Sequence, residues 1–188
     1  IKIIMQEKNI PKSINFLQTE LEKLVNGNFP LDMLTITKSL KSYYKNPESI
    51  AHKVLADRIG EREPGNKPLP SDRIPYVYIV KKEKKGEKML QGDKIELPRY
   101  ILEHNLKPDY LTYITNQIMK PVCQIYSLIV EELEGYKYHK TYFKDMYKRF
   151  EKEHGKDKAI EKINKRKNDL VSDILFSDSI RKAENKKN

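Results

Sequence analysis

The amino-acid sequence predicts an α+β fold that is mainly helical and carries a small antiparallel sheet. Most apolar residues recur at helical spacing, whereas segments 35–40 and 73–80 are rich in β-branched and aromatic residues. The chain has 188 residues, of which 38% are hydrophobic, so it can bury a core of its own. We therefore expect one domain, or one domain with an appendage.

The first predicted helix covers 11–25, because Pro11 suits a first turn and Gly27 suits a C-terminal end. A half-buried strand is predicted over 35–40, where β-branched or apolar residues alternate with polar ones. Lys38 would then lie on one defined face of that strand.

A second helix is predicted over 46–60, with Asn46 as its N-cap and Gly60 at its end. Segment 61–72 holds three prolines and a glycine, too many breakers for a regular element, so we expect an ordered loop. The helix and loop together present basic or titratable side chains at His52, Lys53, Arg58, Arg62 and Lys67.

The next strand is predicted over 73–80, and Pro75 near its start indicates an edge position or a strand entry. The charged run 81–86 is interpreted as a solvated hairpin tip. Further helix starts are predicted at Pro98 and at 108–109.

From Tyr113 to Ile129 the helical period continues across an expected kink at Pro121. Beyond Tyr136 the composition shifts, with 16 Lys and Arg against 9 Asp and Glu. Two charged amphipathic helices are predicted there, whereas 181–188 is too polar to fold alone.

An aromatic stripe recurs every four residues in this C-terminal region, at Tyr138, Tyr142, Met146 and Phe150. It could pack against the preceding domain, or it could form a surface that docks a partner protein. Both interpretations stay open at this point.

Composition excludes several classes of protein. The 37 Lys and Arg against 27 Asp and Glu give a net charge of +10, which attracts polyanions such as nucleic acid or acidic membrane surfaces. Cys123 is the single cysteine, so an internal disulfide framework and a cysteine zinc cluster are excluded and a reducing, intracellular location is expected. No apolar stretch approaches the length needed to span a membrane, and no signal peptide is visible.

Motifs for catalysis are also missing from the sequence. The glycines never reach the spacing of a phosphate-binding loop, and no Asp-x-Asp pair occurs to hold two metal ions. The four histidines lack the i, i+4 pairing of a helical zinc site. The chain therefore has the character of a binder rather than a catalyst.

Three motifs in order resemble family B DNA polymerases. Segment 45–79, from Lys-Asn-Pro to Tyr-Val-Tyr-Ile, resembles the thumb of that family. Segment 34–40 resembles the Thr-Lys-x-Leu strand between palm and thumb, and 109–121 is similar to the Tyr-x-x-x-Gln-(Leu or Ile)-x-x-Pro helix. The resemblance covers about residues 10 to 135 and is closest to the delta-like branch, particularly to polymerases of large nucleocytoplasmic DNA viruses.

The sequence departs from the family pattern at three places. Ser71 stands where the family often has Gly, and Gln124 replaces a common basic residue. The paired cysteine clusters at the C-terminus of the cellular delta enzyme are absent, so the role of the C-terminal region cannot be carried over from it.

The resemblance implies three parts: the C-terminal end of a palm (1–40), a thumb (41–135) and a basic helical C-terminal extension (136–188). It also implies that the aspartates holding Mg²⁺, and the fingers, would lie upstream of Ile1, so no catalytic or metal-binding residue is expected in this fragment. The intact protein would be a DNA-directed DNA polymerase, intracellular, in the host cytoplasm or nucleus if viral.

The fragment itself is expected to grip primer-template duplex through phosphates and the groove. The candidate DNA-binding residues are Lys38, His52, Lys53, Arg58, Arg62, Lys67 and Arg73. We expect these side chains to line one concave wall, with Asp72 as a loop cap or a partner of Arg73, and Tyr113 in the core.

Two alternatives remain. The chain could be a free-standing basic protein that binds RNA or DNA, which a reading frame starting near Ile1 would favour. It could instead be a docking module in which the helices of 136–176 bind a replication partner.

Overall fold

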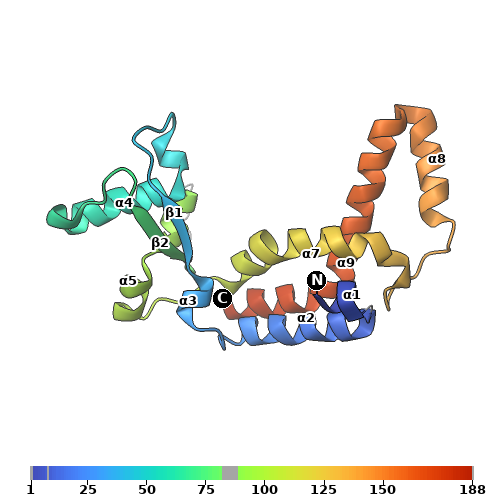
Figure 1. Cartoon of the computed structure of the whole chain (residues 1–188), viewed down its shortest axis with the longest axis horizontal. Coiled ribbons are helices and arrows are strands. Elements are labelled where there is room, and N and C mark those ends of the chain that lie inside the picture. The colour runs from blue at the N-terminus through green and yellow to red at the C-terminus, as the bar shows by residue number, and fades with distance from the viewer. Residues whose placement is uncertain (1, 8, 82–88, 188) are drawn as a thin grey trace. The chain divides into compact units, whose positions relative to one another are not determined.

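The computed structural model describes residues 2–7, 9–81 and 89–187, which divide into two compact units (Figure 1). The helical unit comprises Ile1–Val25 and Ile114–Lys186, and the sheet unit comprises Asn26–Tyr113. Each unit has its own core and is considered by itself. The mainly helical α+β fold with a small antiparallel sheet is confirmed.

The sheet unit contains three antiparallel strands in the order β1-β2-β3: β1 (Ile36–Ser39), β2 (Arg73–Tyr78) and β3 (Ile95–Glu96). Ile36 lies opposite Tyr76, and Ser39 opposite Arg73, whereas β3 pairs only with Val77 and Tyr78. Pro75 therefore sits where β2 is paired with β1 alone, so its missing N–H removes no bond to β3.

Helix α4 (Ala51–Arg62) covers one face of this sheet (Figure 1). The core between them consists of Leu40, Leu55, Ala56, Ile74, Tyr76 and Ile95. The predicted helix starting at Asn46 is instead a 3₁₀ turn, η1 (Pro47–Ser49), followed by extended Ile50 and then α4. The side chain of Asn46 makes no capping hydrogen bond, and Ser49 Oγ donates to the carbonyl of Asn46 instead. The start of the α-helix is therefore displaced to Ala51.

Short elements complete the sheet unit: α3 (Leu31–Leu34), η2 (Pro64–Asn66), η3 (Gln91–Lys94), α5 (Pro98–Glu103) and α6 (Tyr110–Thr112). The predicted helix starts at Pro98 and at 108–109 are confirmed. Pro98 occupies the first turn of α5, and the carboxylate of Asp109 caps α6 by accepting from the N–H of Thr112 at 3.1 Å. Most of the predicted hairpin tip at 81–86 lies outside the described residues.

The helical unit contains α1 (Lys2–Glu7), α2 (Ile10–Val25), α7 (Met119–Tyr126), η5 (Ser127–Glu132), α8 (Tyr142–His154) and α9 (Lys156–Lys187). The predicted kink at Pro121 is not at the proline. A π-helical stretch, η4 (Tyr113–Ile118), precedes α7, and Pro121 falls in the first turn of α7, where its missing N–H is tolerated.

The core of the helical unit joins α2 to the second half of α9. Its fully buried side chains include Leu21, Val25, Val171 and Phe176. The buried hydroxyl of Tyr126 donates to Ser13 Oγ at 2.8 Å, which ties α7 to α2.

The two predicted C-terminal helices are confirmed as α8 and α9, and α8 runs beside the first half of α9 (Figure 1). Residues 181–187, which were predicted to be too polar to fold alone, continue α9. This segment does not fold alone, because Ala183 is buried and Lys186 Nζ donates to the carbonyl of Val25 at 2.9 Å.

Two residues of the aromatic stripe, Tyr142 and Phe150, and the neighbouring Phe143 lie against cations of α9. Lys162 lies 5.4 Å from the Phe150 ring, Lys167 lies 4.8 Å from the Phe143 ring, and Arg166 Nε donates to the hydroxyl of Tyr142. Tyr142 and Phe150 of the stripe therefore contact α9.

Candidate nucleic-acid interface

Two arginines of α4 are directed inward, onto a buried carboxylate. Arg62 Nη2 donates to Glu96 Oε2 at 3.0 Å, and Arg58 Nε lies 3.5 Å from the same oxygen, an ion pair without hydrogen-bond geometry. Glu96 is only 3% exposed and sits on β3. A carboxylate so deeply buried requires this compensation, so both arginines serve the fold.

Further contacts fix the same arginines. Arg58 Nη2 donates to the carbonyls of Ile95 at 2.6 Å and Gly92 at 3.2 Å, and the Arg62 guanidinium lies 3.9 Å from the centre of the Tyr100 ring. Arg58 and Arg62 therefore fasten α4 to η3, β3 and α5. Their charge is partly neutralised before any DNA phosphate approaches.

His52 links α4 to β1. Its Nε2 lies 3.1 Å from the hydroxyl of Tyr44, which also accepts from the N–H of Lys41 at 2.8 Å. Burial, followed by the charge of Lys38, lowers the pKa of His52 below 6.5, while a backbone hydrogen bond with Ser39 acts in the opposite direction. His52 is therefore neutral near pH 7, which suits a structural link better than a cationic phosphate contact.

Lys53 and Lys67 lie on the outer side of α4. Lys53 forms an i, i+4 ion pair with Asp57, and the stem of Lys67 packs against Gly60, where an added Cβ would lie 2.8 Å from Lys67 Cγ. Because Lys53 and Gly60 are seven residues apart on one helix, both lysines belong to the same side. Lys67 is exposed and Lys53 is partly exposed.

Lys38 and Arg73 lie on opposite faces of the sheet. Lys38 is opposite Ile74, whose buried side chain belongs to the core beneath α4, whereas Arg73 is opposite Ser39. Directly opposed residues share a face and successive residues alternate, so Arg73 projects away from α4. The expectation of a single wall containing all seven candidates is therefore wrong.

The sheet face turned away from α4 carries small polar side chains that sequence reasoning missed. Thr37 and Ser39 on β1 are exposed, as is Arg73 on β2. We call Thr37, Ser39 and Arg73 the open sheet face. The alternation of 35–40 contained the signal, because its polar positions 37 and 39 fall on the face without the core residues.

The turn before β2 is held by Asp72. Its Oδ2 accepts from the N–H of Leu69 at 2.7 Å, so the loop-cap interpretation is confirmed. Ser71 has a φ of 77°, a left-handed conformation that favours glycine. This conformation gives a physical reason why the family often has glycine where this chain has Ser71.

Tyr113 belongs to the core, as predicted. It is 6% exposed, its hydroxyl donates to the carbonyl of Leu34 at 2.6 Å, and it accepts from the N–H of Tyr78 at 3.0 Å. Burial raises the pKa of Tyr113 to about 12. The side chain is unavailable to the DNA groove.

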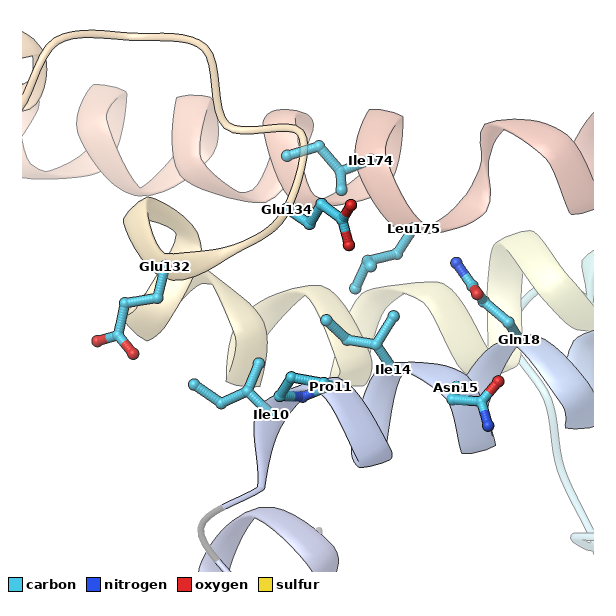
Figure 2. Close-up of a pocket in the computed structure, with 9 residues that line it drawn as sticks. All are labelled: Ile10, Pro11, Ile14, Asn15, Gln18, Glu132, Glu134, Ile174 and Leu175. Carbon is cyan, nitrogen blue, oxygen red and sulfur yellow. The ribbon is translucent and has the colours of Figure 1, made fainter.

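A cavity of about 500 Å³ in the helical unit lies between α2, α9 and the segment after α7 (Figure 2). It is lined by apolar Ile14, Ile174 and Leu175 and by the carboxylates of Glu132 and Glu134, of which Glu134 lies close to Ile174 and Leu175. Carboxylates repel phosphates, so this hollow does not suit nucleic acid. Within the described ranges, no group of three His, Cys, Asp or Glu side chains could hold a metal ion.

No helix in the part of the chain that the structure describes is long and apolar enough to cross a bilayer.

Comparison with known proteins agrees with the resemblance. The model of DNA polymerase family B matches residues 1–129. A DNA polymerase of Pyramimonas orientalis virus is 44% identical over 193 residues, covering 100% of this chain and 16% of that protein. A DNA polymerase of Acanthamoeba polyphaga mimivirus is 48% identical over 144 residues, covering 76% of this chain and 8% of that protein.

Cellular relatives are more distant. The DNA polymerase delta catalytic subunit of Candida albicans is 32% identical over 132 residues, covering 70% of this chain and 12% of that protein. The chain thus spans less than a fifth of the length of each of these relatives. The family match, the viral relatives and the delta subunits together show that this chain belongs to the family B DNA polymerases and resembles their delta-like viral members.

Proposed function

We propose that this chain is the palm end (1–40), thumb (41–135) and basic C-terminal extension (136–188) of a DNA-directed DNA polymerase, and that it grips primer-template duplex. The observation that carries the proposal is the exposed, basic end of the β1–β2 pair within the residues matched by the family B model.

The grip runs along the edge strand β1. Arg73, Thr37 and Ser39 approach the phosphates from the open sheet face, and the long side chain of Lys38 reaches them from the other face of the same strand. Arginine, lysine and hydroxyl groups bind phosphate oxygens without reading sequence, which permits the duplex to slide after each nucleotide is added.

The other candidates divide into two roles. Arg58, Arg62 and His52 hold α4 against β3 and β1, so they support the surface rather than touch DNA. Lys67 is available on the outer side of α4 for phosphates at longer range, whereas Lys53 on the same side is paired with Asp57.

The polymerisation chemistry belongs to the intact protein. The described side chains do not fit a two-metal centre, because they contain no cluster of three metal-ligating groups. We propose that Mg²⁺ is bound by residues outside this chain, and that the protein acts inside the host cell. A replication partner bound through 136–188 remains a prediction.

Measurement of primer-template affinity against salt tests the proposal. The logarithm of the association constant should fall linearly with the logarithm of salt concentration, by about 0.9 per phosphate neutralised. Two duplexes of unrelated sequence should give nearly the same affinity. A flat salt response, or strong preference for one sequence, contradicts the proposed grip.

A further inference from the structure

Helix α8 has one face committed to packing and an opposite face of free lysines. Phe143 is buried, and the Phe150 ring, seven residues later on the same side, lies next to Lys162 of α9. The exposed residues Lys144, Lys148 and Lys152 follow one another at intervals of four, which aligns them on a different side of the helix. We call these three residues the α8 lysine row.

The α8 lysine row is not used in ion pairs with the side chains that the structure describes. The acidic residues of α8 are Asp145, Glu151 and Glu153; of these, Glu151 accepts from the hydroxyl of Tyr147 and Glu153 lies 3.7 Å from His154. The three lysines of the row are therefore available to bind an external anion.

The cations of α9 that face α8 contact its aromatic side chains. Lys162 and Lys167 lie over the rings of Phe150 and Phe143, and Arg166 donates to the hydroxyls of Tyr138 and Tyr142. Tyr138 and Tyr142 also stack with their centroids 4.2 Å apart. These contacts pin α8 to α9, so the lysine row is presented by a supported helix rather than a flexible tail.

The spacing suits an extended polyanion. Four residues of α-helix advance about 6 Å, so the row places three point charges over about 12 Å, which matches a run of phosphates better than a compact anion. Lysine binds phosphates as a point charge and carries no base preference.

The row also lies outside the part shared with the whole family. The family B model ends at residue 129, whereas the alignment with the Pyramimonas orientalis virus polymerase covers the entire chain. From these observations we infer that the C-terminal extension is a second phosphate-binding surface, in which Lys144, Lys148 and Lys152 hold the nucleic-acid backbone. This inference rests on the proposed function and adds a site to it.

The experiment compares two triple variants of the 188-residue chain. One is Lys144→Gln, Lys148→Gln and Lys152→Gln. The matched control is Lys12→Gln, Lys23→Gln and Lys182→Gln, which removes three lysines of the same unit that are each paired with a glutamate. Both variants change the net charge from +10 by the same amount.

Primer-template affinity is measured by fluorescence anisotropy over a salt series. For the α8 variant, the slope of log affinity against log salt should become shallower by about 0.9 for each phosphate that is no longer neutralised, hence by about 2 to 3. The control should retain nearly the slope of the unmodified chain. Thermal unfolding of each variant checks that the fold is kept.

Each outcome decides the question. An unchanged slope for the α8 variant would overturn the inference and would favour a protein partner for this face. Equal changes in both variants would also overturn it, because net charge alone would then explain binding. If the unmodified chain binds no duplex, the proposed function fails together with the inference. If the unmodified chain binds duplex and the α8 variant binds it with the same slope, the inference fails while the proposed function stands.

Discussion

Glu96 determines what the basic residues of α4 can do. Its buried carboxylate holds Arg58 and Arg62, two residues that the sequence alone would assign to DNA. Neither the strand containing Glu96 nor this contact was predictable, because β3 has only two residues and lies 34 positions from Arg62 in the chain.

Replacing Glu96 with Ala should destabilise the sheet unit by about 3 kcal/mol, because two partly buried guanidinium groups lose their common acceptor. Chemical denaturation measures the change. The control is Glu103→Ala, which breaks an exposed pair with Arg99 and should leave stability nearly unchanged. Equal losses in the two variants would show that Glu96 is not the anchor of these arginines.

His52 should make the fold sensitive to acid. Because the pKa of His52 is lowered in the folded chain, its neutral form contributes stability that is complete above pH 6.5 and is lost as pH falls through the folded pKa. In His52→Gln, the decline in the free energy of unfolding between pH 7 and pH 5 should be smaller than in the unmodified chain. Denaturation at three pH values measures this. If the free energy of unfolding of His52→Gln declined as much as that of the unmodified chain, the structural role would be excluded. The control is His139→Gln, which replaces an exposed histidine.

Ser71 occupies a backbone position better suited to glycine. Ser71→Gly relieves the left-handed strain at φ 77° and should raise stability by about 0.5 to 1 kcal/mol. Ser127 is the control, because its φ of −61° is right-handed and unstrained. Ser127→Gly should lower stability by about 0.5 to 1 kcal/mol. Thermal melting compares them, and a loss of stability in Ser71→Gly would refute the strain.

At the scale of elements, the approach of η3 to α4 depends on Gly92. A Cβ at this buried position would lie 2.5 Å from Val54 Cβ, whereas a Cβ at Gly65 would meet no atom within 4 Å. Gly92→Ala should therefore cost about 1 to 3 kcal/mol by forcing the two elements apart. Gly65→Ala should change stability by no more than about 0.5 kcal/mol. Comparable melting temperatures for the two variants would contradict this packing.

Elements with a clear period were predictable, and those set by distant contacts were not. The periodicity of 11–25 and the alternation of 35–40 predict α2 and β1 with nearly correct bounds. The start of α4 at Ala51 and the helical end of α9 depend on local capping and on burial against Val25, which a single segment does not reveal.

The same limit applies to the candidate site. Basic residue types in 38–73 predicted a charged surface, and the alternation of the strand placed Lys38 on one face. Which cations remain free depends on Glu96 and on the register of Ser39 with Arg73, and both are products of the tertiary fold.

At the scale of the whole molecule, a net charge of +10 is distributed between cations that support the fold and cations that face solvent. The central claim is that the second group binds the duplex backbone. Lysine acetylation followed by mass spectrometry, with and without primer-template duplex, tests this claim residue by residue. We predict that duplex slows acetylation of Lys38 and of the α8 lysine row, while Lys12 and Lys23 react as before. Unchanged acetylation of Lys38 in the presence of saturating duplex would contradict the proposed grip along β1, and unchanged acetylation of the row would contradict the second surface.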